Sequence, residues 1–288
     1  MKTVIIADSC SDLPLNYVEE QNIPIVHFPF NFKGKEYHDD FGKTLSYKEF
    51  YDAVRAGEMP TTSQVNVQTF IDIFKGFVKE GHSVIYMAFS SALSGTYSNA
   101  VLARNILIEE YPDADITVID TKSASLGEGL LVYYAIDMLK KGAQKQEIID
   151  WVENNKLRLN HWFTVEDLGH LKRGGRLSGA AAFIGTVLSI KPVLHIDDEG
   201  RLIPVLKTRG RKNSLNTLAD MLEERIVEPE KQVIAISHGD CLDDALYLKE
   251  LVLGKVKVKD LIINNIGPVI GSHSGPGTVA LFFLGEHR

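Results

Sequence analysis

Short apolar runs alternate with amphipathic helical patterns through the first half of this chain, and no other feature limits the fold as strongly. Residues 4–7, 84–88 and 116–119 are continuous apolar runs rich in branched side chains, as expected for parallel strands buried on both faces. Between them, apolar residues from 67 to 78 follow i, i+3, i+4, i+7 spacing, which predicts a helix with one apolar face. The alternation predicts an α/β domain with a parallel sheet.

The pattern changes after about residue 160. Residues 193–196 and 201–206 flank an Asp-Asp-Glu-Gly turn, which predicts a hairpin. Helices are predicted near residues 212–226 and 243–253, and strands over 233–237, 261–264 and 279–284. A chain of 288 residues exceeds the ~100–200 that are typical of one domain. We therefore expect an α/β domain over residues 1–160 and an α+β domain over residues 161–288.

Charge and hydropathy exclude several classes of protein. The formal net charge is −7, from 31 Lys and Arg against 38 Asp and Glu, so general affinity for nucleic acid is not expected. No run approaches the ~18 apolar residues of a membrane span, and the N-terminal apolar run is too short for a secretory signal. Cys10 and Cys241 lie far apart, which predicts no disulfide framework. The cytoplasm is the expected compartment.

Two segments that precede predicted helices are rich in hydroxyl groups. One contains Thr61, Thr62 and Ser63, and the other, SSALSGTY, contains Ser94 and Gly95. Single Ser and Thr residues at such positions are most simply N-caps. As a cluster, hydroxyls beside free helix N–H groups are also suited to binding an anion. Both segments would lie at the carboxyl ends of parallel strands, where open α/β sheets bind ligands.

The segment GSHSG, residues 271–275, forms a predicted Gly-rich loop centred on His273. It is not a G-x-S-x-G nucleophile elbow, because the central residue is histidine. The following G-x-G-x-x-A match precedes a strand-like run and is too close to the C-terminus for a dinucleotide site. His273 is flanked by Ser272 and Ser274, and nothing in the sequence orients it as a base. A hydrogen-bond donor is therefore the expected role.

Other polar residues give no metal-site pattern. His161, Glu166, Asp167 and His170 lack a known ligand spacing, so surface or helix-capping roles are expected. Asp39, within His-Asp-Asp, is expected in a solvated loop. No metal site is predicted.

Two basic runs stand out in this acidic chain: LKRGGRLSG at residues 171–179 and KTRGRK at residues 207–212. Solvated loops would account for both. Glycine beside arginine also allows close backbone approach to a phosphate or carboxylate. Residues 180–188 then predict a helix whose small residues leave room for a neighbouring helix or for an apolar ligand chain.

Taken together, these segments resemble the DegV family of bacterial fatty-acid-binding proteins. The motifs that carry the resemblance span nearly the whole chain: ADSCSDLP (residues 7–14), TTSQ (61–64), SSALSGTY (90–97), IDTKSASLGEG (119–129), LKRGGRLSG (171–179), LSIKPVL (188–194) and IGPVIGSHSGPGT (266–278). Any one of these motifs would be weak evidence, but their number and order make the resemblance specific.

The resemblance implies a two-domain fold with a long-chain fatty acid buried between the domains. The carboxylate would be held by the TTSQ and LSGT segments and by the closing loop; the residues implied are Thr62, Ser63, Ser94, Gly95, His273 and Ser274. The fatty acid is the ligand, and no other cofactor is implied. The protein would be a non-catalytic carrier that presents the acid to a separate ATP-dependent fatty acid kinase. Candidates for docking that kinase are Arg173, Arg176, Arg209 and Arg211.

Such a site would bind the carboxylate through neutral hydroxyls and amides without a buried arginine, so the apolar tail would supply most of the affinity. Two other functions remain open. His273 with Ser94 or Ser274 could hydrolyse an acyl ester if Asp8 or Asp120 supplied the orienting acid. A nucleic-acid-binding regulator could use the basic runs, but the net charge and the absence of a helix-turn-helix pattern argue against it.

Overall fold

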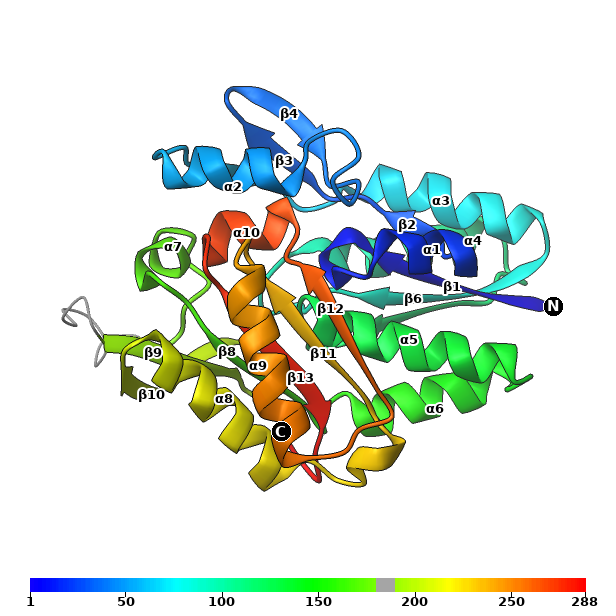
Figure 1. The fold of residues 1–288 in the computed structure, drawn as a ribbon. Coiled ribbons are helices and arrows are strands. Elements are labelled where there is room, and N and C mark those ends of the chain that lie inside the picture. Colours follow the sequence, from blue (N-terminus) through cyan, green and yellow to red (C-terminus); the bar gives the residue numbers. More distant parts are fainter. Residues whose placement is uncertain (180–189) are drawn as a thin grey trace.

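The computed structural model describes residues 1–179 and 190–288. Its first half contains the expected parallel sheet, with strands in the order β2–β1–β6–β7 (Figure 1). Parallel pairing joins Lys2 to His82 and Val84 to Ile116. The strands are β1 (Lys2–Asp8), β2 (Ile25–Val26), β6 (His82–Ala88) and β7 (Ile116–Asp120). The parallel sheet predicted from the apolar runs is confirmed.

Helices cover both faces of this sheet. Figure 1 shows α3 and α4 on one side and α5 and α6 on the other, and α3 and α4 pack against β6 and β7 respectively. Five of the helices of this half are α1 (Leu15–Gln21), α3 (Val67–Lys79), α4 (Thr96–Glu110), α5 (Leu126–Lys140) and α6 (Lys145–Asn155). The helix expected over residues 67–78 is thus present.

A small three-stranded antiparallel sheet forms a separate layer near the top of Figure 1. It consists of β3 (Pro29–Phe32), β4 (Lys35–His38) and β5 (Thr61–Thr62), and α2 (Tyr47–Arg55) lies beside it. Phe30, Phe32 and Phe50 are buried and in ring contact. Thr61 and Thr62 are therefore strand residues and not helix caps; the side chain of Asn66 caps α3.

The second half is built on a six-stranded mixed sheet in the order β10–β9–β8–β13–β11–β12. The predicted hairpin is confirmed, because β9 and β10 pair in antiparallel fashion. The strands are β8 (Leu159–Thr164), β9 (Ile190–Ile196), β10 (Leu202–Arg209), β11 (Val233–His238), β12 (Asp260–Asn265) and β13 (Val279–Leu284). The helices are α7 (Leu168–Arg173), α8 (Arg211–Arg225), α9 (Leu242–Lys255) and α10 (Pro268–Ser274). The helix expected over residues 180–188 lies outside the described residues.

Helix α5 lies between the two large sheets. It contacts β1 and β6 of the parallel sheet as well as β8, β11 and β13 of the mixed sheet. Its first seven residues are all buried, as expected for a helix enclosed on every side. The two halves therefore share one hydrophobic core around α5.

The change from one half to the other occurs just before β8. Because β8 begins at Leu159, the expected division between residues 160 and 161 falls inside a strand. We retain two domains as a proposal and place their junction between α6 and β8. Within residues 1–179 and 190–288, every helix is too short or too polar to cross a bilayer.

Candidate functional site

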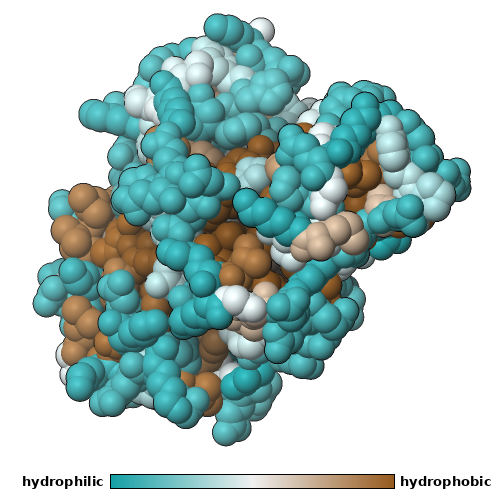
Figure 2. Space-filling model, turned by 90° about the vertical axis from the view of Figure 1, so that its right-hand side faces the viewer, coloured by the Kyte–Doolittle hydropathy of each residue, from teal (hydrophilic) through white to brown (hydrophobic). Residues whose placement is uncertain are grey.

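A largely apolar cavity of about 420 Å³ lies between the two halves. This volume falls within the range of about 300–1,000 Å³ that is usual for small-molecule sites. The parallel sheet contributes the segments that follow β6 and β7, and the mixed sheet contributes one face of β8, β11 and β13. Figure 2 shows apolar residues gathered at mid-height on one side of the molecule, between more hydrophilic regions above and below.

All six predicted ligand-binding residues line this one cavity: Thr62, Ser63, Ser94, Gly95, His273 and Ser274. In the sequence they belong to three segments separated by many residues, and the fold brings those segments together. Whether these residues hold a ligand stays a prediction, but the cavity gives all of them access to the same molecule.

His273 does not lie in a loop, as the sequence suggested, but in the last turn of α10. Pro268 occupies the first turn of this helix, a position where its missing N–H is tolerated. Gly267 precedes it, and its N–H donates to Oδ1 of Asp12 at 2.8 Å. The hydroxyl of Tyr51 also donates to the carbonyl oxygen of Ile266. These two bonds hold the start of α10 against the first half of the chain.

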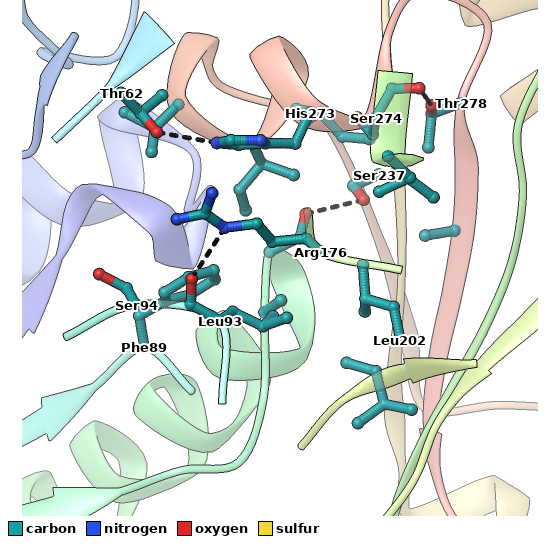
Figure 3. Close-up of a pocket in the computed structure, with 18 of the residues that line it drawn as sticks. Thr62, Phe89, Leu93, Ser94, Arg176, Leu202, Ser237, His273, Ser274 and Thr278 are labelled. Atoms are coloured by element: carbon teal, nitrogen blue, oxygen red, sulfur yellow. Dashed lines mark hydrogen bonds between the residues drawn. The ribbon is translucent and has the colours of Figure 1, made fainter. Parts of the chain in front are cut away.

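The central polar contact of the cavity joins His273 Nε2 to Thr62 Oγ1 at 2.8 Å (Figure 3). Burial, together with the charge of Arg176, lowers the pKa of His273 to about 4, so the ring is neutral at pH 7. Its buried Nδ1 has no hydrogen-bond partner among the described residues. Leaving a lone pair without a partner there is less costly than leaving an N–H, so we assign the proton to Nε2.

This tautomer fixes the direction of the Thr62 hydroxyl. Because Nε2–H of His273 donates to Thr62 Oγ1, the hydroxyl proton of Thr62 remains available to another acceptor. The arrangement therefore presents a donor to the cavity, as a carboxylate ligand requires.

Ser94 and Gly95 form the start of α4. The Ser94 hydroxyl lies 2.9 Å from Thr96 Oγ1 and accepts a hydrogen bond from the Thr96 N–H, but Ser94 precedes the N-cap and is not the cap that the sequence suggested. Gly95 is the N-cap of α4, where the first four N–H groups lack intrahelical partners. A Cβ at Gly95 would lie 2.0 Å from Oε1 of Gln64, so the exposed Gln64 side chain would have to shift to admit it.

Arg176, which the sequence led us to expect on a docking surface, belongs to the cavity. It is partly buried, lines the cavity and donates through Nε to the carbonyl oxygen of Leu93 at 3.2 Å. In Figure 3 its guanidinium lies between the Thr62–His273 pair and Ser94. A partly buried arginine therefore lines the cavity beside the predicted carboxylate-binding residues, where the sequence led us to expect only hydroxyls and amides. The Arg-Gly-Gly-Arg spacing was the available signal, because those glycines let the chain turn inward.

The other predicted docking residues divide into two kinds. Arg173 and Arg209 are exposed, as docking requires. The side chain of Arg211 is only 17% exposed and pairs with Asp244 and Glu166. Its guanidinium also donates to the carbonyl oxygen of Gly277. Arg211 therefore joins parts of the second half internally, and its expected docking role is corrected on that ground.

Ser274, the last residue of α10, is buried, and its hydroxyl has no partner from the described parts of the chain. Its carbonyl oxygen accepts from the hydroxyl of Thr278, which also bonds to Gly275. This turn connects α10 to β13 beside the cavity.

Two residues expected at the surface are in fact buried. His161, in β8, is 1% exposed because its side chain lies on the face of the mixed sheet that lines the cavity. Asp39 is 1% exposed and packs near Gly267 together with Asp12. The expected capping role of Asp167 is confirmed, since its side chain accepts from the N–H of Gly169.

Asp39 belongs to a group of buried carboxyl groups behind the cavity. Burial raises the pKa of Asp8 to about 6 and that of Asp12 to about 7. It also raises the pKa of Asp39 and of Glu128 well above their ordinary values. Asp12 is linked to the cavity by Ser125, which lines the cavity and donates to its Oδ2 at 2.5 Å. No set of three or more His, Cys, Asp or Glu residues in the described chain is arranged to hold a metal ion.

The hydrolase alternative requires an acid that orients His273, and the described residues provide none, because Nδ1 is unpaired. Asp8 accepts instead from Tyr86 and Phe89, and Asp120 accepts from Ser91 and Lys122. The imidazole also bonds to Thr62 and not to Ser94 or Ser274. The geometry favours a binding site over a nucleophile–base pair.

Comparisons with known proteins agree with the geometry. A family model described as "Uncharacterised protein, DegV family" matches residues 2–286. A DegV domain-containing protein of Clostridium perfringens is 51% identical over 287 residues, which cover 100% of this chain and 99% of that relative.

Two solved structures have the same fold. The structure of a fatty-acid-binding DegV family protein from Thermus thermophilus matches with a TM-score of 0.90 and 31% identity, covering 99% of this chain and 100% of that chain. A stearic-acid-binding protein from Eubacterium ventriosum matches with a TM-score of 0.87 and 27% identity, covering 99% of each chain. The match to the family model and the 51% identity to the Clostridium perfringens protein show that this chain belongs to the DegV family.

Proposed function

We propose that this protein is a carrier that holds a long-chain fatty acid in the cavity between its two halves. The observation that carries the proposal is the Thr62–His273 pair, which presents a hydroxyl donor at one end of a largely apolar cavity. The fatty-acid-binding relatives from Thermus thermophilus and Eubacterium ventriosum support this choice of ligand.

The carboxylate would accept from Thr62 and Ser94 and from N–H groups at the start of α4, with Ser63 and Ser274 nearby. Arg176 would supply a positive charge at the same end. Hydrogen bonds to a charged group contribute about 1.5–3 kcal/mol each. A tail with about fourteen buried methylenes would contribute roughly 11 kcal/mol. The tail therefore dominates affinity, while the polar end sets which way the chain points.

A carrier must also release its ligand or make the head group available. We infer that a separate ATP-dependent kinase docks near Arg173 and Arg209, both of which are exposed. The carboxylate oxygen would attack the γ-phosphorus of ATP, forming an acyl phosphate as the bond to ADP breaks. This chain would supply the substrate and its orientation, and the kinase would supply the nucleotide site. The cytoplasm, where ATP is available, is the proposed compartment.

The first test is native mass spectrometry of the protein purified from a bacterial host, followed by denaturing extraction of the bound molecule. We expect an added mass that corresponds to a long-chain fatty acid. The double variant Thr62→Val/Ser94→Ala should lose most of this mass, and Thr61→Val, an exposed neighbour in the same strand, should retain it. Ligand-free wild-type protein that also fails to take up added fatty acid would contradict the proposal.

A further inference from the structure

A second polar group lies in the cavity wall, apart from the Thr62–His273 pair. Ser125, the N-cap of α5, and Ser237, in β11, both line the cavity, and their Oγ atoms are 2.9 Å apart. Ser125 Oγ also lies 2.5 Å from Oδ2 of Asp12. These three side chains come from both halves of the molecule and form a continuous hydrogen-bonded chain that ends at the cavity.

This chain leaves Ser237 with unused hydrogen-bonding capacity. When Asp12 is ionised, Ser125 donates to it and accepts from Ser237, so the oxygen lone pairs of Ser237 remain available. When Asp12 is protonated, the chain can run in the opposite direction, and the hydroxyl proton of Ser237 becomes available instead. In both cases Ser237 can bond to a group that both donates and accepts.

His161 provides another unmatched polar atom in the same wall. Its Nδ1 lies 3.1 Å from the carbonyl oxygen of Leu159, so Nδ1 must carry the proton. Its buried Nε2 is then an acceptor, and no described residue donates to it. Nε2 lies beside the first turn of α5, because a Cβ at Gly127 would be 2.1 Å from it. Gly127 follows Ser125 by two residues.

The polar groups of Ser237 and His161 are unexpected in the wall of a cavity that holds a plain alkyl chain. The surrounding wall is apolar and includes Phe163, Ala280 and Phe282. A purely hydrocarbon tail in the cavity would offer no hydrogen bond to Ser237 or to His161, both of which are buried and belong to the cavity wall. Both side chains can accept a hydrogen bond, and the group that would satisfy either of them is a hydroxyl.

We infer that the acyl channel has a second subsite, made by Ser237 and His161, that accepts a fatty acid carrying a hydroxyl group along its chain. This inference rests on the proposed fatty-acid binding and names a substrate class for that same cavity. In an apolar channel without such partners, a chain hydroxyl would lose its hydrogen bonds to water and weaken binding by about tenfold or more. Here the wall can replace those bonds.

The test compares stearate with a series of stearates, each hydroxylated at one position between the middle and the end of the chain. Dissociation constants are measured by competition with a fluorescent fatty acid. We expect at least one hydroxystearate to bind the wild-type protein as tightly as stearate or more tightly. In Ser237→Ala the ratio of its dissociation constant to that of stearate should rise about tenfold.

Ser214→Ala is the matched control, because Ser214 is a buried serine of α8 whose hydroxyl donates to the carbonyl oxygen of Arg211. It should leave the ratio unchanged. Tight stearate binding combined with hydroxystearates that all bind at least tenfold more weakly would overturn this inference alone. An unchanged ratio in Ser237→Ala would also overturn it. Failure of every ligand to bind would overturn the proposed function itself.

Discussion

His273 Nε2 lies 2.8 Å from Thr62 Oγ1 although 211 residues separate the two in the sequence. The contact joins the last turn of α10 to a two-residue strand of the small sheet. Since the neutral imidazole is assigned its proton on Nε2, it donates to Thr62, and the hydroxyl proton of Thr62 is available to another acceptor. Several predictions about ligand binding and stability depend on this pair and on the residues that hold it in place.

Thr62→Val removes the hydroxyl while keeping the branched shape of the side chain. We expect the affinity for a long-chain fatty acid to fall about 10- to 100-fold, because one hydrogen bond to a charged group is lost. Displacement of a fluorescent fatty acid measures the change. Thr61→Val should bind like the wild type, because Thr61 is exposed and outside the cavity. Equal affinities for the two variants would remove Thr62 from the head-group site.

His273 should make stability depend on acid pH. Its folded-state pKa is about 4, below the value of about 6.5 for an unfolded chain. The contribution of the neutral imidazole to the free energy of unfolding is therefore fully present above pH ~6.5. It falls as the pH drops towards ~4, by at most about 3 kcal/mol. Below that range no further loss from this residue is expected.

His273→Gln isolates this effect, because glutamine keeps an N–H donor for Thr62 but does not titrate. Both proteins are unfolded in urea between pH 4 and pH 7. As the pH falls, the free energy of unfolding of the wild type should decrease more than that of the variant. His38→Gln, a change at an exposed residue, is the control. Parallel pH profiles for wild type and His273→Gln would show that the imidazole is not held in its neutral form.

Gly174 leaves space for the imidazole ring. A Cβ at this position would lie 2.2 Å from His273 Nδ1, so Gly174→Ala should push the ring away from Thr62. We expect fatty-acid affinity to fall about tenfold, as for loss of the hydrogen bond itself. Gly175→Asn is the matched control, since asparagine tolerates its positive φ of 69° and no atom of residues 1–179 or 190–288 lies within contact distance of the added Cβ. If both variants bound equally well, the close approach would have no role in binding.

Arg176 influences His273 through its charge. Arg176→Met should raise the pKa of His273, because a positive charge that disfavours the imidazolium is removed. An NMR titration of the imidazole measures this shift. Arg176→Lys keeps the positive charge, so the pKa of His273 should stay low in this variant. The comparison distinguishes the effect of the charge from that of the hydrogen bond to Leu93. The methionine variant should also bind ionised fatty acid about tenfold more weakly; Arg173→Met, at an exposed position, should not.

Kinase docking should be separable from lipid binding. Arg173→Glu/Arg209→Glu reverses two exposed charges outside the cavity, so fatty-acid affinity should stay unchanged. Acyl phosphate formation with a fatty acid kinase, trapped as the hydroxamate, should fall at low salt. Lys79→Glu, at the end of α3, is the control. Full phosphorylation by the double variant would place docking elsewhere on the surface.

Much of the fold could be read from local patterns. Continuous apolar runs predicted β1, β6 and β7, because a parallel strand buried on both faces is apolar along its length. The Asp-Asp-Glu-Gly turn predicted the β9–β10 hairpin, because its two strands are adjacent in the sequence. The small sheet was missed, since β5 has only two residues and gains its pairing from a distant strand. The loop expected around His273 proved to be α10, because Gly and Ser in a helix of seven residues conceal its periodicity.

The sequence by itself determined the fold family and which hydroxyl-rich segments would line the cavity, because whole motifs carry that information. The roles of individual side chains depended on the tertiary structure. Burial against Gly174 makes His273 neutral, and the turn at Gly174 and Gly175 takes Arg176 from the surface to the cavity. The chain from Asp12 through Ser125 to Ser237 joins residues of both halves. Protonation and hydrogen-bond direction depend on which groups surround an atom in space, and only the packed structure decides those neighbours.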